Sequence, residues 1–579
     1  MTALLAVARR VQKLIGREPE LQTLHQAIFP GDNSCQIVFI QGQGGFGKTR
    51  LLEEVLLRLG TPLQDVEGVF SSGEWQNYDE VVATEIIDLF DTRLHTRNRF
   101  LQQVRDSLGW TYRFSSFEFS FSEFQTALSN YQRSVLDNVE YHLTQKAAAE
   151  AIEAFWKDYT RITTNRRVVW AIDTAEQVNA TASGWLVEEG VLEADQLYFQ
   201  AQSLLIEGLK AGRFQNSTLL LAGRHEEGAA FFKAIETAAQ LAGINVQWIQ
   251  ARELTEEEVR EYLLELLREW KANQGETPQE QQSINDIIDI LVWLTQENTK
   301  RASVFTRYTG GQPVRLSLFA DLLVESGTLP DMIEDIETLE TGQLSEEDVE
   351  RRQWQWEDQF ITLLFQRPRL GIQRFSQENI LKLKEEISKI TLRSEILKML
   401  VRARLGLTAE QIHYLMDNPS ALPPQEWKNQ ARPERIRQIA DVLKDLRQLS
   451  IVKPRPDRQT FGTSAREEKY RIGLQDEIYR IFAEHMAPLQ DVGQHINKAH
   501  GRERDRLQRL RDGFNSEQLA VFQTRFETEC EERWRLYRLL RAWAEYQKEE
   551  LGKQLRDIID RNSSSGIAVK GPAASSQAI

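Results

Sequence analysis

The chain has 579 residues, which is enough for three or four domains at about 150 residues each and excludes a single small module. Hydrophobic residues make up 41% and charged residues 27%, so wholesale disorder is excluded as well. The net charge of -15 excludes an overall basic footprint for nucleic acid, although a local basic patch is compatible with it. Two distant cysteines, Cys35 and Cys530, form no disulfide framework, and no apolar run reaches the roughly 18 residues of a membrane helix. We expect a cytoplasmic, multidomain protein without a membrane partner.

The first 250 or so residues alternate short apolar runs with amphipathic stretches, which predicts an α/β fold with a parallel sheet and crossover helices. The runs are rich in β-branched or aromatic side chains, as strands covered on both faces need. The predicted strands are Gln36–Ile40, Val66–Phe70, Val168–Ile172, Thr218–Ala222 and Ile244–Ile249. Residues 71–165 carry mostly helical patterns, so we expect a helical insertion beside the sheet.

Beyond Arg252 the pattern becomes helical. Thr255, followed by three glutamates, predicts a capped helix start. Much further on, helical segments are followed by two β-like pieces, Ser450–Lys453 and Lys469–Ile472, an order that suggests a winged-helix domain. The expected boundaries are 1–14 for an N-terminal helix or arm, 15–250 for the sheet domain, 251–335 for a helical lid, 336–486 for the winged helix, 487–561 for a charged helical segment and 562–579 for a disordered tail.

The strongest motif is the phosphate-loop pattern G-x-x-x-x-G-K-[ST], which residues 42–49 satisfy in full. Its glycines let successive backbone N–H groups turn inward around phosphates, and the following helix adds a favourable dipole. We expect Lys48 to reach the β- and γ-phosphates and Thr49 to bind Mg²⁺. A glycine-rich turn with an incidental lysine is the alternative, which a preceding strand and a following helix disfavour. The nucleotide-binding candidates here are Gly42, Gln43, Gly44, Gly45, Phe46, Gly47, Lys48, Thr49 and Arg50.

Charged residues that are candidates for binding metal or taking part in catalysis follow two further predicted strands. The strand Val168–Ile172 ends in Asp173, the expected second partner of Mg²⁺, and Glu176 follows as a candidate for orienting or deprotonating the attacking water. Glu176 could instead only cap the next helix. Arg224 follows the strand Thr218–Ala222, and because ligands of parallel sheets bind at the carboxyl ends of strands, we expect it to point towards the γ-phosphate. The alternative is a solvated arginine. The catalytic candidates are Lys48, Glu176 and Arg224.

Taken in order, these motifs resemble the STAND class of signalling ATPases, a class related to the AAA+ proteins, with NACHT-like and NB-ARC-like modules. The sequence IGREPEL, which contains Gly16 and Arg17, looks like the family's signature near the adenine pocket. The residues Ile172–Glu176 are similar to a bacterial "DTxE" acidic box, and Arg224 falls at the family's sensor arginine. Pro313 belongs to a GxP motif whose proline packs near the adenine in the family. A winged helix follows, as in the family.

The resemblance implies an ATP/ADP-controlled switch that hydrolyses ATP slowly with Mg²⁺ and forms a homo-oligomer on activation, in bacterial defence or regulatory signalling. Gln475 stands where many members carry a histidine that touches the ADP phosphate; glutamine can donate a hydrogen bond but carries no charge. Only about 14 residues precede Ile15, too few for a folded effector, so we expect either that partner proteins supply effector and sensor functions or that this chain is shortened.

A different class of function is left open by the same residues. The winged helix of a DNA-acting AAA+ loader or initiator, or of an ATP-dependent transcriptional regulator, would contact nucleic acid. The GxP motif and the net charge of -15 argue against this alternative, and Arg315 near that motif keeps it open.

Overall fold

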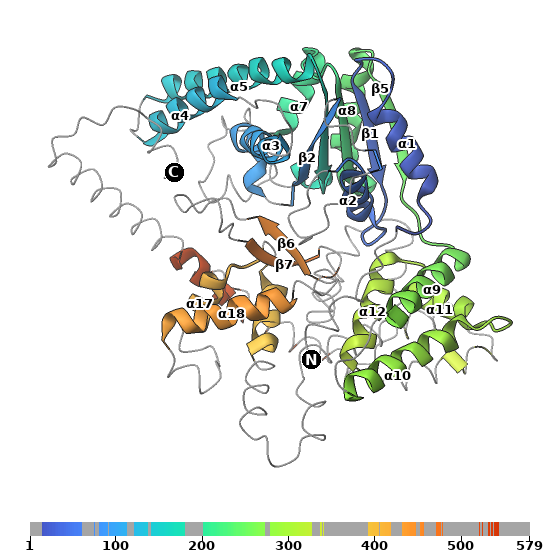
Figure 1. The fold of residues 1–579 in the computed structure, drawn as a ribbon. Helices are drawn as coiled ribbons and strands as arrows, with labels where there is room; N and C mark the ends of the chain where they lie inside the picture. Colours follow the sequence, from blue (N-terminus) through green and yellow to red (C-terminus); the bar gives the residue numbers. More distant parts are fainter. Residues whose placement is uncertain are drawn as a thin grey trace. The chain divides into compact units, whose positions relative to one another are not determined.

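The computed structural model describes residues 14–60, 74–75, 80–90, 92–112, 121–136, 140–179, 201–272, 278–326, 336–337, 340, 352, 392–403, 406–417, 431–446, 452–456, 470–475, 478, 520, 524, 528, 531–532, 534–536 and 538–543. Figure 1 shows their helices and strands. The chain divides into two compact units, Lys13–Glu253 and Leu254–Ile579, the latter together with Met1–Gln12. In these ranges no helix is both long and apolar enough to cross a bilayer.

The first unit is built on one sheet of parallel strands. Its strands are β1 (Gln36–Gln41), β2 (Val81–Asp88), β3 (Arg167–Asp173), β4 (Ser217–Gly223) and β5 (Asn245–Gln250). They lie in the order β2-β3-β4-β1-β5, and every neighbouring pair is parallel. Strands β1, β3 and β4 are buried along their whole length, because helices cover them on both faces. The predicted P-loop α/β fold is confirmed.

The helices of the first unit are α1 (Glu18–Ile28), α2 (Lys48–Arg58), α3 (Arg97–Tyr112), α4 (Ser122–Leu136), α5 (Tyr141–Thr163), α7 (Ala201–Lys210) and α8 (His225–Leu241), with 3-10 helices η1 (Thr92–His95) and η2 (Ala175–Asn179). They lie on both faces of the sheet (Figure 1). Successive side chains of a strand point to opposite faces, so Ile37 and Phe39 enter one apolar core and Val38 and Ile40 the other. Helices α1 and α2 close the second of these cores.

Strand β2 corrects the prediction of a mostly helical insertion at 71–165. It lies inside that stretch, yet it forms an edge of the sheet beside β3. The apolar pattern missed it because Thr84 and Glu85 interrupt the run at a β-bulge, where the register with β3 shifts. Around this strand the predicted helices are present as α3, α4 and α5. The predicted strand Val66–Phe70 lies outside the described residues.

The second unit begins with helices. They are α9 (Glu256–Ala272), α10 (Pro278–Thr295), α11 (Arg301–Thr309) and α12 (Pro313–Ser326). The predicted cap at the start of α9 is confirmed: the Glu258 N–H donates to the Thr255 hydroxyl at 3.3 Å, and the Glu258 carboxylate accepts from the Thr255 N–H at 2.7 Å. This reciprocal pair satisfies two N–H groups that a helix start otherwise leaves without partners.

The later part of this unit combines helices α17 (Ala409–Met416) and α18 (Arg432–Leu446) with strands β6 (Val452–Pro456) and β7 (Tyr470–Leu474). The two strands are antiparallel, and an isolated bridge joins Leu407 to Ile472 of β7. Apolar side chains of both helices and both strands share one core, which includes Ile412, Leu443 and Val452. The predicted order of helices followed by a hairpin is therefore present. Residues 562–579 lie outside the described residues, as does most of 487–561.

Candidate active site

The carboxyl ends of three adjacent strands carry the candidate site. Strand β4 lies between β1 and β3, and all three run in the same direction. The loop of residues 42–47 follows β1, Asp173 ends β3, and Arg224 follows β4. The sheet topology therefore brings the phosphate loop, Asp173, Glu176 and Arg224 to one edge of the sheet, where parallel sheets bind their ligands.

The phosphate loop turns through two glycines with left-handed backbone, Gly45 (φ 80°) and Gly47 (φ 81°), and Gly47 is the N-cap residue of α2. Glycine adopts such angles at little cost. The Lys48 ammonium donates to the carbonyl oxygens of Gly42 (2.8 Å) and Gln43 (2.7 Å). The lysine therefore bridges the start of the loop beside the amino end of α2, where the helix dipole favours negative charge.

Thr49 and Asp173 join this loop to the end of β3. The Thr49 hydroxyl donates to Asp173 Oδ2 over 2.7 Å, and Asp173 Oδ1 accepts from the Thr174 N–H at 2.9 Å. Asp173 is only 3% exposed. A hydroxyl and a carboxylate are hard oxygen donors of the kind that Mg²⁺ takes alongside phosphate oxygens. The two residues fit a magnesium ion.

Glu176 lies in η2, directly after β3, and contacts the residue that follows β4. Its Oε2 accepts from the Arg224 N–H at 3.0 Å, and its Oε1 lies 3.9 Å from Arg224 Nε. Burial raises the pKa of the Glu176 carboxyl to about 7, against the opposing effects of the positive charges on Arg224 and Lys48. A carboxylate with a pKa near neutral pH is well matched to accepting a proton.

Two glycines, Gly223 and Gly228, lack the side chains that would otherwise occupy the space of Glu176. A Cβ added to Gly223 would lie 2.6 Å from Glu176 Oε2, and one added to Gly228 would lie 2.9 Å from Glu176 Cβ. Both distances are shorter than real Cβ contacts, so a side chain at either position would displace Glu176 from the place it holds here. Gly228 lies in the first turns of α8, where glycine is unfavourable by roughly 1 kcal/mol relative to alanine. That unfavourable glycine was the signal in the sequence, which the pattern analysis missed.

The Arg17 side chain contacts the backbone of the phosphate loop. Its guanidinium donates to the carbonyl oxygens of Phe46 (3.2 Å) and Arg252, and it pairs with Glu20 at 3.2 Å. The side chain is 4% exposed. Its neighbour Gly16 has a φ of 66° at the turn before α1. Arg17 therefore ties the segment before α1 to both the loop and the chain after β5.

The remaining predicted nucleotide contacts lie on helices or in the second unit. Arg50 lies on α2, where it pairs with Glu54 at 3.3 Å. Pro313 is the first residue of α12 and follows Gly311, whose carbonyl oxygen accepts from the Leu254 N–H at 2.8 Å. Gln475 directly follows β7. Their contacts with nucleotide stay predictions.

Two residues of the first unit, Asp88 and Thr174, lie at the site but were not predicted as site residues from the sequence. Asp88 ends β2 and accepts a hydrogen bond from the Thr174 hydroxyl at 2.8 Å. Thr174 has a φ of 56°, which is an outlier for a β-branched residue and costs about 1–3 kcal/mol. Asp88 was not predicted because strand β2 was not predicted. Thr174 was not predicted because a strained φ angle cannot be recognised from the sequence.

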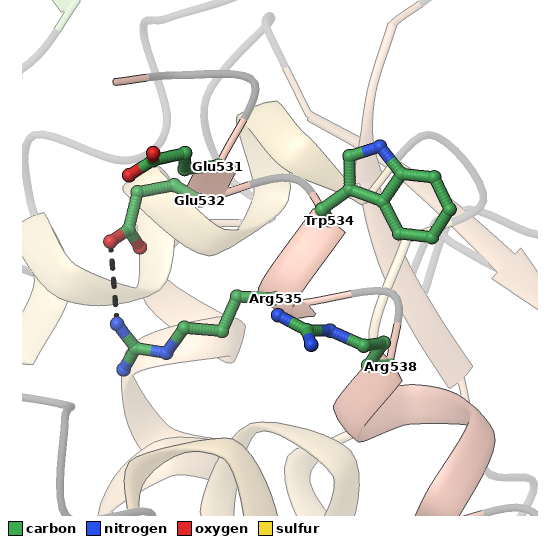
Figure 2. Close-up of a pocket in the computed structure, with 5 residues that line it drawn as sticks. All are labelled: Glu531, Glu532, Trp534, Arg535 and Arg538. Atoms are coloured by element: carbon green, nitrogen blue, oxygen red, sulfur yellow. Dashed lines mark hydrogen bonds and ion pairs between the residues drawn. The ribbon is translucent and has the colours of Figure 1, made fainter. Parts of the chain in front are cut away.

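The second unit holds a pocket of about 500 Å³ on the described part of the C-terminal segment. Figure 2 shows its lining, in which Glu532 pairs with Arg535 at 3.3 Å. Trp534 is 66% exposed, whereas Leu536 and Leu540 pack against the apolar core of this unit. None of the described residues that line this pocket is a predicted site residue.

Residues 13–187 match the family model of the AAA ATPase domain. The match includes the phosphate loop, Asp173 and Glu176, and it ends before Arg224. The chain contains a P-loop ATPase domain. Nucleotide binding is therefore a property of this chain, and the predicted ATPase activity is confirmed.

Comparison with solved structures finds similar chains at low identity. The Aeropyrum pernix ORC2 protein, in its ADPNP–ADP complexes, is 13% identical with a TM-score of 0.31; the match covers 83% of this chain and 96% of that one. A Walker-type ATPase of Pyrococcus abyssi is 14% identical (TM-score 0.29, coverage 82% and 97%), and Drosophila ORC bound to DNA is 11% identical (TM-score 0.31, coverage 84% and 98%). TM-scores this low carry no argument about function. No curated protein matches the sequence.

Proposed function

We propose that the protein is an ATP/ADP-controlled switch of the STAND class, in which slow hydrolysis of ATP resets the active state. The observation that carries this proposal is the contact between Glu176 and Arg224. One carboxylate holds both the backbone N–H and the guanidinium of the arginine at the edge where the phosphates would bind. A γ-phosphate competes with Glu176 for the arginine, whereas ADP has no such group. ATP and ADP therefore make different contacts, which is what a ligand needs to shift a conformational equilibrium.

Each residue of the site has a proposed task. Lys48 exchanges its two carbonyl partners, Gly42 and Gln43, for phosphate oxygens. Thr49 and Asp173 hold Mg²⁺, which neutralises negative charge on the phosphate oxygens when bound. Glu176 accepts the proton of the attacking water, since its pKa of about 7 leaves a substantial ionised fraction at neutral pH. Arg17 keeps the loop in place through the Phe46 carbonyl.

The second unit is proposed to respond to the nucleotide. The hairpin of β6 and β7, its bridge to Leu407 and the helices α17 and α18 support a winged-helix domain within 336–486. Residues 251–335 are proposed as the lid, with Pro313 near the adenine. Gln475, at the end of β7, is proposed to donate a hydrogen bond to the ADP phosphate. Exchange of ADP for ATP would then expose a surface for homo-oligomer formation and for partner proteins with effector or sensor functions.

Mass photometry with ATP, with ADP and without nucleotide tests this proposal. We expect the wild-type chain to form larger assemblies with ATP than with ADP, and Glu176→Gln to retain them for longer. Lys48→Ala should stay in the small form throughout. Equal masses under all conditions would contradict a switch that oligomerises. A mass increase that requires duplex DNA and disappears at higher salt would instead favour the DNA-acting alternative.

A further inference from the structure

The ends of β2 and β3 each carry an aspartate, and the register places the two side by side. Asp88 is the partner of Asp173 in the parallel ladder. This pairing depends on the β-bulge. Ala83 pairs with Val169, and continuing that register would place Asp88 opposite Thr174; the shift before Ile86 moves Asp88 back by one residue. One residue of register decides the face on which a side chain lies.

The bulge is held by specific side-chain hydrogen bonds. The Ala171 N–H of β3 donates to the Thr84 hydroxyl at 3.0 Å, and the Glu85 N–H donates to the Ser107 hydroxyl of α3 at 2.9 Å. These contacts are buried. They give backbone N–H groups on both sides of the irregular register a side-chain acceptor. The position of Asp88 opposite Asp173 is therefore a fixed feature of the fold.

Asp88 uses this position to hold Thr174. Its Oδ1 accepts from the Thr174 hydroxyl at 2.8 Å and from the Phe90 N–H at 3.1 Å. The backbone beside it is anchored as well, because the Leu89 N–H donates to the Asp173 carbonyl oxygen at 3.0 Å. The carboxylate therefore presents an acceptor to the Thr174 side chain of the acidic box from an anchored stretch of backbone.

Thr174 sets the direction of both functional carboxylates. It lies between Asp173 and Glu176 with a φ of 56°, a conformation that a β-branched residue adopts only when its surroundings hold it there. In this conformation its N–H donates to Asp173 Oδ1 (2.9 Å), and its carbonyl oxygen accepts from the Gln177 N–H (3.0 Å), which starts η2 and so places Glu176.

We propose that Asp88 is a positioning residue of the ATPase reaction. Its carboxylate keeps Thr174 in the left-handed conformation, and that conformation keeps Asp173 at the metal position and Glu176 at the proton-accepting position. The inference rests on the proposed roles of Asp173 and Glu176. Misplacement of either group slows hydrolysis, since rate depends steeply on the geometry of the reacting groups. Binding of ATP depends chiefly on the phosphate loop and is largely unaffected.

The experiment is a double-mutant cycle on the full chain, with Asp88→Ala, Thr174→Val and the double variant, read as kcat and KM for ATP. Each single change removes one partner of the hydroxyl–carboxylate bond, and valine keeps the shape of threonine. We expect each to lower kcat about tenfold with KM within about twofold of wild type, and the double variant to lose no more than either single one. Asp88→Asn keeps an acceptor oxygen and should retain kcat within about threefold.

The outcomes separate this inference from the proposed function. A wild-type kcat in Asp88→Ala, or losses that multiply in the double variant, would overturn the role of Asp88 while the ATPase itself stands. Unaltered hydrolysis in Glu176→Gln would instead remove the proposed site on which the role depends. If Asp88→Ala does not fold, the comparison of Thr174→Val with Asp88→Asn decides: equal kcat in the two variants contradicts the inference.

Discussion

An arginine lies at each end of the strands of the central sheet, which we call the amino edge and the carboxyl edge. The two arginines have different partners. At the amino edge, Arg167 is 5% exposed and donates to the Ser217 carbonyl (3.2 Å), the Thr218 hydroxyl (3.2 Å), and the carbonyls of Asp32 (2.6 Å) and Ser34 (3.0 Å). At the carboxyl edge, Arg224 is 24% exposed and faces the carboxylate of Glu176. The acceptors of Arg167 are neutral backbone carbonyls and a hydroxyl, which are parts of the folded chain itself. Arg224 contacts a titratable carboxylate, which the γ-phosphate is proposed to replace.

This difference indicates that the amino edge of the sheet contributes to stability and the carboxyl edge to function. Neutral acceptors around a buried cation fix the ends of β3 and β4 together with the chain before β1, and their loss leaves buried polar groups without partners. The carboxyl edge instead holds charged side chains in contacts that the proposed phosphate ligand would exchange. A change at the amino edge is thus expected to affect unfolding, and one at the carboxyl edge to affect nucleotide chemistry.

The largest expected effect is the loss of nucleotide binding in Lys48→Ala. Removal of the ammonium should weaken ATP binding at least about a hundredfold, because it removes the positive charge that lies against the two loop carbonyls. The melting temperature without nucleotide should stay near that of the wild type. Isothermal titration calorimetry measures the affinity, with Lys146→Ala on the exposed surface of α5 as the control. Wild-type affinity in Lys48→Ala would remove the proposed site.

The next effect is on the rate of hydrolysis in Glu176→Gln. We expect kcat to fall about a hundredfold while ATP binding persists, since the amide cannot accept the proton. In the wild type the ionised carboxylate is the active form, so kcat should rise with pH and reach half of its maximum near pH 7. Steady-state kinetics between pH 5.5 and 8.5 measures both. A pH-independent wild-type rate would assign proton transfer to another group.

The same buried carboxyl predicts a change in stability with pH. Its pKa is higher in the folded state (about 7) than the ordinary value of 4.5, so the folded chain binds the proton more tightly and stability falls as pH rises from about 4.5 to 7. Glu176→Gln removes this loss and should be more stable than the wild type at pH 8, by about 3 kcal/mol, and about equal at pH 4.5. Chemical denaturation at the two pH values measures this difference.

The comparison of the two edges is sharpened by a pair of variants, Arg167→Met and Arg224→Met. We expect Arg167→Met to lower the free energy of unfolding by about 3 kcal/mol, because it leaves buried acceptors without donors. Arg224→Met should lower stability by less than about 1 kcal/mol but reduce kcat about tenfold. Denaturation and kinetics on both proteins measure these values. A larger loss of stability in Arg224→Met than in Arg167→Met would reverse the assignment.

The smallest effect is expected at Gln475. A charged donor binds phosphate more strongly than a neutral one, so Gln475→His should slow the release of a fluorescent ADP analogue several-fold, most clearly below neutral pH where the imidazole is charged. Gln475→Ala should release it faster. Stopped-flow fluorescence measures the rates. Identical rates in all three proteins would show that the residue after β7 does not contact the nucleotide.

The sequence predicted the features that depend on local pattern. Apolar runs identified β1, β3, β4 and β5, and the glycine spacing identified the phosphate loop. The gathering of Asp173 and Arg224 at one edge followed from parallel strands alone. Strand β2 was hidden by its bulge. The Glu176–Arg224 contact and the space that Gly223 and Gly228 leave for Glu176 depend on how separate backbone segments approach, which no local pattern encodes.

The central claim is that ATP, and not ADP, separates Glu176 from Arg224. The most direct measurement is a pair of crystal or cryo-electron microscopy structures of the wild-type chain, one with ADP and Mg²⁺ and one with a non-hydrolysable ATP analogue and Mg²⁺. With ADP, we predict that the Arg224 N–H remains about 3.0 Å from the Glu176 carboxylate. With the ATP analogue, the Arg224 guanidinium should contact the γ-phosphate, and the Glu176 carboxylate should lie beyond hydrogen-bond distance of Arg224. An unchanged Glu176–Arg224 contact in both structures would contradict the account.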